Sequence, residues 1–175
     1  MRFTRQLAVS FVIPVLIGNA PVRAGDTQED VTKTIATFKK KDPGIEKFFQ
    51  DAVGYAVFPT VGKGAIGVGG AHGTGELLTG GKAVGKVSLT QVTVGLQFGG
   101  QSYSEIIFFE TQRTLDSFKD GDFAFAAQAT AVALTAGAAA NAAYRDGVAV
   151  FTIAKGGLMY EASIGGQKFS FKPYK

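Results

Sequence analysis

The chain of 175 residues contains no cysteine and no tryptophan, and it has a single histidine. Without cysteine it can build neither a disulfide framework nor a thiolate metal site. One histidine excludes metal sites that need two, and a Ser-His-Asp triad would depend on His72, although no nucleophile elbow is present. We therefore expect no metal, no cofactor and no catalysis, with His72 as a polar side chain on a strand or turn.

Charge is also scarce, at 18% of residues, whereas 46% are hydrophobic and 24 are glycine. This composition is typical of a globular protein and not of a disordered one. The net charge of +4 depends on three arginines in the first 24 residues, and without them 15 basic and 14 acidic residues remain. A net charge of +1 argues against a strongly basic nucleic-acid-binding protein.

The amino-terminal segment has the layout of a secretory signal peptide. A short basic start precedes the apolar run Leu7–Ile17, which is too short to span a bilayer as a helix. Val22 and Ala24 suit cleavage after residue 24, and no cysteine follows to take a lipoprotein anchor. We predict a signal peptide over 1–24 and one domain over 25–175, periplasmic or peripheral on envelope membranes. An amino-terminal core helix is the alternative.

Helical periodicity comes first in the remaining chain and alternation follows it. Residues 26–38 place apolar side chains at i, i+4 and i+7, which predicts an amphipathic helix. Asp42 can cap a second short helix that begins at Pro43 and buries Ile45, Phe48 and Phe49. From Tyr55 onward the period becomes two, which indicates strands.

The stretch "TVGKGAIGVGGAHGTGE", residues 60–76, contains a literal G-x-G-x-x-G. A dinucleotide site needs a helix directly after these glycines, but further glycines follow and disfavour one. A P-loop-like stretch, residues 80–88, has Val87 where a hydroxyl must meet magnesium. We therefore expect no nucleotide partner. The alternation instead predicts a strand face made of glycine and alanine, which lets another backbone pack closely.

Further alternating segments predict strands over 86–100, 101–110 and 147–155, with a second strand after a turn at residues 155–157 and a last one after a glycine bend at 165–166. Residues 111–121 predict a short helix that ends at Gly121. The alanine-rich segment 123–144 fits either strand or helix, and alternation favours strand. Glu105 and Glu161 could form an acid/base pair, but we interpret each as an edge or solvent-facing carboxylate.

Three segments, "GYAVFPTVGKGAIGVGGAHGTGELL", "SLTQVTVGLQFGGQSYSEIIFF" and "DGVAVFTIAKGGLMYEASIGGQKFSF", together resemble the SYLF domain family of lipid- and actin-binding domains. The resemblance covers about residues 38–175. It implies an α+β fold: a strongly curved, Gly-rich antiparallel sheet, barrel-like, with amino-terminal helices and one short helix between strands. It also implies no catalysis.

The resemblance further implies contact with membranes. Eukaryotic members are associated with phosphoinositide-containing membranes and actin, and this chain looks like the exported bacterial branch. Actin binding is not carried over, because no longer basic tract is present and a periplasm holds no actin. We expect an anionic membrane lipid as the partner, contacted by an amphipathic helix and by Lys39, Lys40, Lys41, Lys47 and Lys63. The alternatives are that the helix packs on the sheet with solvated lysines, that the partner is an envelope protein, or that an apolar ligand sits inside the sheet.

Overall fold

The computed structural model describes residues 28–66, 68–94, 101–121, 131–156 and 167–175, with side chains over slightly narrower ranges (28–62, 70–91, 102–121, 131–155 and 167–175). Three helical elements come first: α1 (Gln28–Lys41), the 3₁₀ turn η1 (Pro43–Ile45) and α2 (Glu46–Asp51). The helix predicted over 26–38 is confirmed from Gln28 and continues to Lys41, whereas residues 26 and 27 lie outside the described residues. Acidic residues in its first turn and lysines in its last turn complement the helix dipole.

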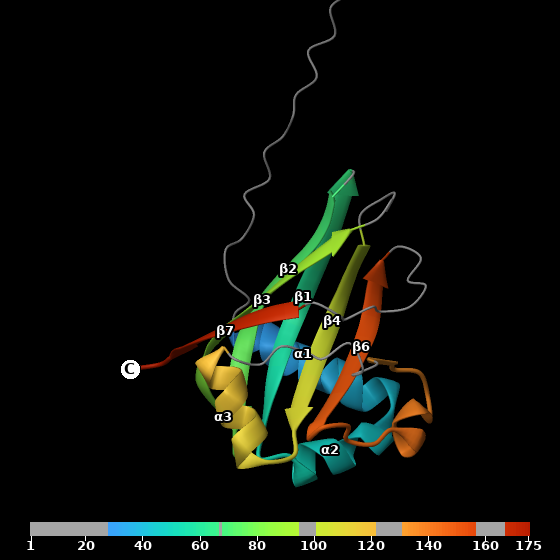
Figure 1. Cartoon of the computed structure of the whole chain (residues 1–175). Coiled ribbons are helices and arrows are strands. Elements are labelled where there is room, and N and C mark those ends of the chain that lie inside the picture. The colour runs from blue at the N-terminus through green and yellow to red at the C-terminus, as the bar shows by residue number, and fades with distance from the viewer. Residues whose placement is uncertain (1–27, 67, 95–100, 122–130, 157–166) are drawn as a thin grey trace, which may run out of the picture.

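Seven strands form one sheet in the order β5-β6-β4-β1-β2-β3-β7. All neighbours pair antiparallel except β5 and β6, which are parallel. Figure 1 shows this arrangement. The bounds are β1 (Gly54–Ile66), β2 (Val68–Thr79), β3 (Lys82–Val94), β4 (Gln101–Phe109), β5 (Val132–Ala133), β6 (Val148–Gly156) and β7 (Gln167–Pro173).

The α+β class is confirmed, as are the amino-terminal helices and the short helix between strands, α3 (Gln112–Asp120). The sheet differs from the predicted antiparallel, barrel-like one in two respects. The sheet is mixed, and its described strands do not close, because β5 and β7 lie at opposite ends of the order. Glycine spacing predicts close backbone approach, but closure requires the two end strands to pair, which is a long-range event. The strong curvature stays a prediction.

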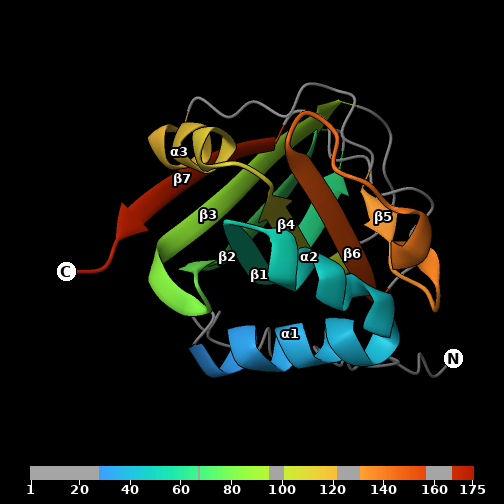
Figure 2. The same ribbon diagram turned by 90° about the horizontal axis from the view of Figure 1, so that it is seen from below.

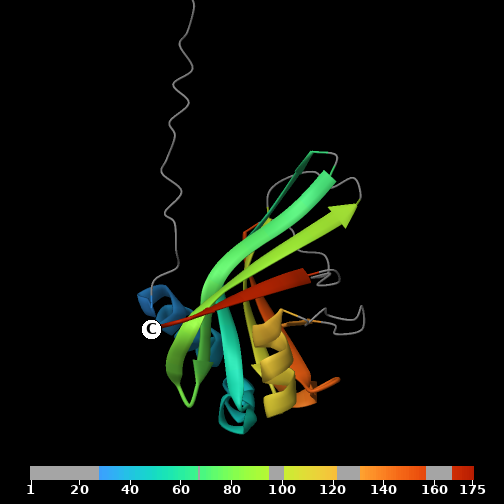
Figure 3. The same cartoon turned by 60° about the vertical axis from the view of Figure 1, so that its left-hand side comes forward.

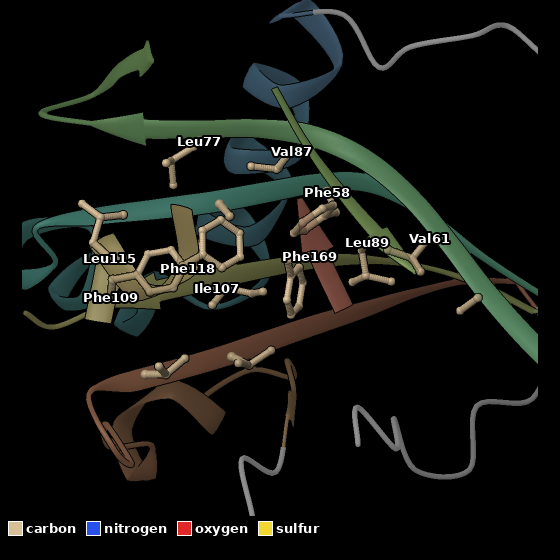
Figure 4. Packing of buried hydrophobic residues seen from close by; sticks show 14 of the residues in the cluster. Phe58, Val61, Leu77, Val87, Leu89, Ile107, Phe109, Leu115, Phe118 and Phe169 are labelled. Atoms are coloured by element: carbon tan, nitrogen blue, oxygen red, sulfur yellow. The ribbon is translucent and has the colours of Figure 1, made fainter. Parts of the chain in front are cut away.

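Helices cover the two faces of the sheet, α1 on one side and α3 on the other (Figure 2). On the α3 face, Leu115 and Phe118 of the helix join a hydrophobic cluster with strand residues such as Phe58, Leu89 and Phe169 (Figure 4). On the α1 face, a second cluster combines helix and strand residues, among them Val31, Phe38, Phe48, Phe108 and Phe151. The central strands are therefore buried on both sides.

The glycine-rich segment forms strands, as its alternation predicted. Gly62 and Gly64 lie in β1, and the backbone at Gly67 is outside the described residues. The P-loop-like stretch is the β2–β3 hairpin, whose turn glycines have φ values of 55° and 75°. Two residues with positive φ are what a tight type I′ hairpin turn requires. These glycines therefore serve strand pairing and turning.

Two other predictions are tested only in part. The alanine-rich segment contains the two-residue strand β5 and the 3₁₀ turn η2 (Ala138–Asn141), so neither a long strand nor a long helix fills its described part. Its residues 123–130 lie outside the described residues. The carboxy-terminal prediction is confirmed for β6 and for the last strand, β7, whereas the strand expected between them lies outside the described residues.

Asp42 joins the amino-terminal helices to the segment that follows β5. Its carboxylate accepts hydrogen bonds from the backbone N–H of Gly44, at 2.9 Å, and from that of Ala139, at 2.7 Å. The first bond confirms the predicted helix cap, and the second spans 97 residues of sequence. The N–H of Ala139 is the main cause that holds the pKa of Asp42 below its ordinary value.

This arrangement makes stability depend on pH in the acid range. Because the folded pKa is depressed, the ionised carboxylate contributes stability above about pH 4, and this contribution is lost as the pH falls through the folded pKa. We expect Asp42→Asn to lower the thermal midpoint at pH 7, and the gap to wild type to narrow below about pH 4. Thermal melts monitored by circular dichroism from pH 7 to pH 2 measure this; a gap that stays constant contradicts it.

Candidate functional site

Four of the five predicted lysines lie where α1 meets α2. Lys39, Lys40 and Lys41 occupy the last turn of α1, and Lys47 lies in α2. The side chain of Lys63, in β1, is outside the described residues. The structure therefore groups the first four, and the part played by Lys63 stays a prediction.

Two of these lysines are held by contacts within the molecule. The Lys39 ammonium lies 2.9 Å from a carboxylate oxygen of Glu46 and 4.6 Å from the centre of the Phe49 ring. The Lys47 ammonium donates a hydrogen bond of 3.4 Å to the carbonyl of Ala142 and lies 4.9 Å from the centre of the Phe48 ring. Both groups thus have structural roles.

Lys40 and Lys41 are different. Both are exposed, and neither forms an ion pair within the part of the chain that the structure describes. Their ammonium groups are available to an external anion, and their place at the carboxy-terminal end of α1 is also electrostatically favourable.

The apolar side of α1 is not available to a membrane. Val31 and Phe38 are 1% and 0% exposed, and Ile35 packs against the same cluster on the sheet. The burial follows from the i, i+4, i+7 spacing, which puts these three side chains on one helix face. The structure therefore matches the alternative in which the helix packs on the sheet, and any membrane contact of α1 is left to its polar side.

A polar groove of about 460 Å³ lies between α1 and the strands β1, β4 and β6. Lys33 and Asp30 of α1 line one wall, and Lys155 at the end of β6 donates a 2.9 Å hydrogen bond to the Thr60 hydroxyl opposite. Deeper in the groove the Ser104 hydroxyl donates to the carbonyl of Pro59 at 2.7 Å. Its charges are mixed, and Lys33 already pairs with Glu29, so the groove shows no preference for one sign of charge.

Glu105 corrects the prediction of an edge or solvent-facing carboxylate. It is 0% exposed in the central strand β4, on the α3 face, and its carboxylate accepts a 3.3 Å hydrogen bond from the Gln167 amide. Tyr103 is buried beside it, and loss of solvation, reinforced by the Glu105 charge, raises the pKa of its hydroxyl. Alternation alone could not reveal this, because it does not tell which faces of a strand are covered. Glu161 lies outside the described residues.

His72 lies exposed in β2. Over the described ranges, no group of three histidine, cysteine, aspartate or glutamate side chains is placed to hold a metal ion. In the same ranges no helix has both the length and the apolar character needed to cross a bilayer.

Comparison with known proteins shows which family and which relative this chain is similar to. Residues 90–173 match the family model described as Ysc84, Las17-binding protein actin regulator. The chain is also 28% identical over 141 residues to Beta cell expansion factor A of Aeromonas veronii, an alignment that covers 79% of this chain and 52% of the relative. The chain thus spans about half the length of the curated relative that it matches.

Proposed function

Because residues 90–173 of this chain match the Ysc84 family model, and the chain resembles SYLF domains, we propose that the protein is a non-enzymatic domain that binds the surface of anionic membranes. The observation that carries the proposal is the exposed pair Lys40 and Lys41, whose charges no described acidic side chain neutralises. Lys39 and Lys47 belong to the same basic region in the proposal, and Lys63 of β1 is included as a separate contact. An exported location, in the periplasm or on envelope membranes, is part of the same proposal and rests on the leader-like residues 1–24.

The binding that we propose is electrostatic. A lysine near an anionic bilayer contributes about 1 kcal/mol of attraction, and this attraction falls off within a Debye length, about 8 Å at physiological salt. The apolar side of α1 is packed on the sheet, so insertion of this helix would first require the loss of that packing. We therefore expect association that weakens steeply as salt is raised.

Co-sedimentation with vesicles tests the proposal. The full chain is mixed with vesicles of phosphatidylglycerol and phosphatidylcholine in equal parts, or of phosphatidylcholine alone, at low and at high salt. We expect the protein to pellet with the anionic vesicles at low salt only. The variant Lys40→Gln/Lys41→Gln should bind them two- to fivefold more weakly, because it loses two charges from a region that also contains acidic residues.

The salt dependence separates this mechanism from others. Residues 7–17 could enter a bilayer by themselves, but apolar insertion would persist at high salt and on uncharged vesicles. Equal binding to both vesicle types, or none to either, would contradict the proposal. In that case the envelope-protein alternative becomes the one to pursue.

A further inference from the structure

The outer part of the α1 face has an uneven distribution of charge. Strands β3 and β7 together contain four lysines and no acidic residue. α1 packs mainly over β1 and β2, and the side chains of β3 and β7 that project to this side are largely exposed. Figures 1 and 3 show these two strands running together at one edge of the sheet.

The register of the two strands puts three of these lysines on one face. Lys86 pairs directly with Lys172, and Lys168 pairs with Thr90, four residues further along β3. Directly opposed residues project to the same face, as do residues separated by an even number along a strand. Lys86, Lys168 and Lys172 are all exposed, and the hydroxyls of Ser88 and Ser170 lie between them, 2.7 Å apart. We refer to these three lysines as the sheet lysines.

The pairing of Lys86 with Lys172 has a cost in stability. Cα atoms of opposed residues lie about 5 Å apart, within a Debye length, and like charges placed in this way destabilise a sheet. Proteins usually retain a local arrangement that lowers stability where that arrangement serves a function. A bound anionic partner would turn this repulsion into attraction.

No described carboxylate forms an ion pair with Lys86 or Lys172. Lys86 has a second cross-strand partner, Glu76 of the neighbouring strand β2. The two form no ion pair of 4 Å or less in the described structure. The Glu76 carboxylate instead accepts a 2.5 Å hydrogen bond from the Tyr174 hydroxyl, and Glu76 is only 6% exposed. Glu76 thus lies on the same face as the sheet lysines, but its carboxylate is bonded to Tyr174 and largely shielded from solvent.

Protection of an edge strand explains only part of this pattern. Lysines on an end strand such as β7 discourage pairing with other chains, which accounts for Lys168 and Lys172. Lys86 lies on β3, which has β2 and β7 as neighbours on its two sides, so it protects no edge. Its cross-strand neighbour Glu76 offsets one charge on this face, but the three sheet lysines still outnumber that single buried acid.

The region around the end of α1 is less basic in comparison. Residues 39–51 contain four lysines, but also Asp42, Glu46 and Asp51. Its formal charge is therefore +1, against +4 for β3 and β7 together. With Glu76 of the neighbouring strand included, the sheet surface still has a formal charge of +3. A broad strand surface with a net positive charge suits an extended anionic surface better than it suits a small ligand.

From these observations we propose that the exposed face of β3 and β7, through Lys86, Lys168 and Lys172, is the main contact with the anionic bilayer, and that the end of α1 is secondary. This inference rests on the function proposed above and names the surface that performs it.

Two variants with the same loss of charge test it in the vesicle assay already described. They are Lys86→Gln/Lys172→Gln on the sheet and Lys40→Gln/Lys41→Gln on α1. We expect the sheet variant to bind about 25-fold more weakly than wild type, about fivefold for each lysine. The α1 variant should lose no more than fivefold. The vesicle affinity of the charge-preserving variant Lys86→Arg/Lys172→Arg should stay within about twofold of that of wild type. This control shows whether replacing these two side chains weakens binding through a folding defect and not through the loss of charge.

Each outcome decides the matter. If wild type binds but the α1 variant weakens as much as the sheet variant or more, the inference is wrong and the proposed function stands. If wild type does not bind anionic vesicles, both the inference and the proposed function are wrong. Wild type that binds duplex DNA but no vesicle at the same salt also overturns the inference, since the sheet lysines would then serve a nucleic acid. A sheet variant that binds like wild type but self-associates on size exclusion would reduce the lysines to edge protection.

Discussion

Replacement of Gly75 with alanine is expected to destabilise the protein by about 3 kcal/mol or more. A Cβ atom at this position would lie 1.9 Å from the carbonyl oxygen of Val57 and 3.1 Å from the Cα of Phe58. Both atoms belong to the backbone of β1, so no side-chain rotation relieves the clash. Urea denaturation followed by circular dichroism would show a lower midpoint, or no cooperative transition.

The clash follows from a bulge in β1. Val57 pairs with Glu76 and Thr60 pairs with Thr74, so two residues of β1 oppose the single Gly75. The bulge contains Pro59, which has no N–H to donate to a ladder and suits such an interruption. The two strands approach closely here because Gly75 has no side chain.

Gly62→Ala is the matched control. A Cβ atom at Gly62, also in β1, would have no heavy atom within 4 Å apart from its own neighbours in the chain. We expect it to leave stability within about 0.5 kcal/mol, or to raise it slightly by restricting the unfolded chain. If both variants lose stability equally, the clash at Gly75 is not the cause.

Truncation of Phe108 to alanine should cost about 3 to 5 kcal/mol. The side chain is 0% exposed on the α1 face, and its ring centroid lies 4.8 Å from that of Phe49 and 5.7 Å from those of Phe48 and Tyr55. These rings join α2 to the sheet, so the variant loses both the burial of a large side chain and the aromatic contacts at that junction. Urea denaturation measures the change.

Val53→Ala serves as the comparison for Phe108→Ala. Val53 is 38% exposed, so removal of its two methyl groups leaves no buried cavity, and we expect less than about 0.5 kcal/mol. A small effect of Phe108→Ala, similar to that of the control, would mean that α2 contributes little to folding stability.

Much of the local structure was predictable from local signals. The Asp42 cap, the apolar side of α1, the stop at Gly121 and the alternation of β3 are each encoded within a few residues, and the structure bears each of them out. Patterns over such short distances report local backbone geometry, since each depends on residues that lie next to one another on a turn or a strand.

These local signals could not predict the burial of Glu105. Its strand was predicted correctly, but the carboxylate was assigned to an edge or to solvent. β4 lies between β1 and β6, and its two faces are covered by elements that are distant in the sequence. Which side of a strand is covered depends on where α1 and α3 pack, and the alternation of residues along the strand does not show this.

By itself, then, the sequence determined the amino-terminal helices, the short helix that ends at Gly121, the strand character of the alternating segments and, through the family resemblance, the α+β class, because each depends on neighbouring residues or on motifs in order. Only the tertiary structure decided that the described sheet is open and mixed, and that Asp42 reaches Ala139. It also decided that Lys86 lies opposite Lys172, residues that are far apart in the chain. Strand order and register bring distant residues together, and they are selected by the packing of the whole domain and not by any local pattern.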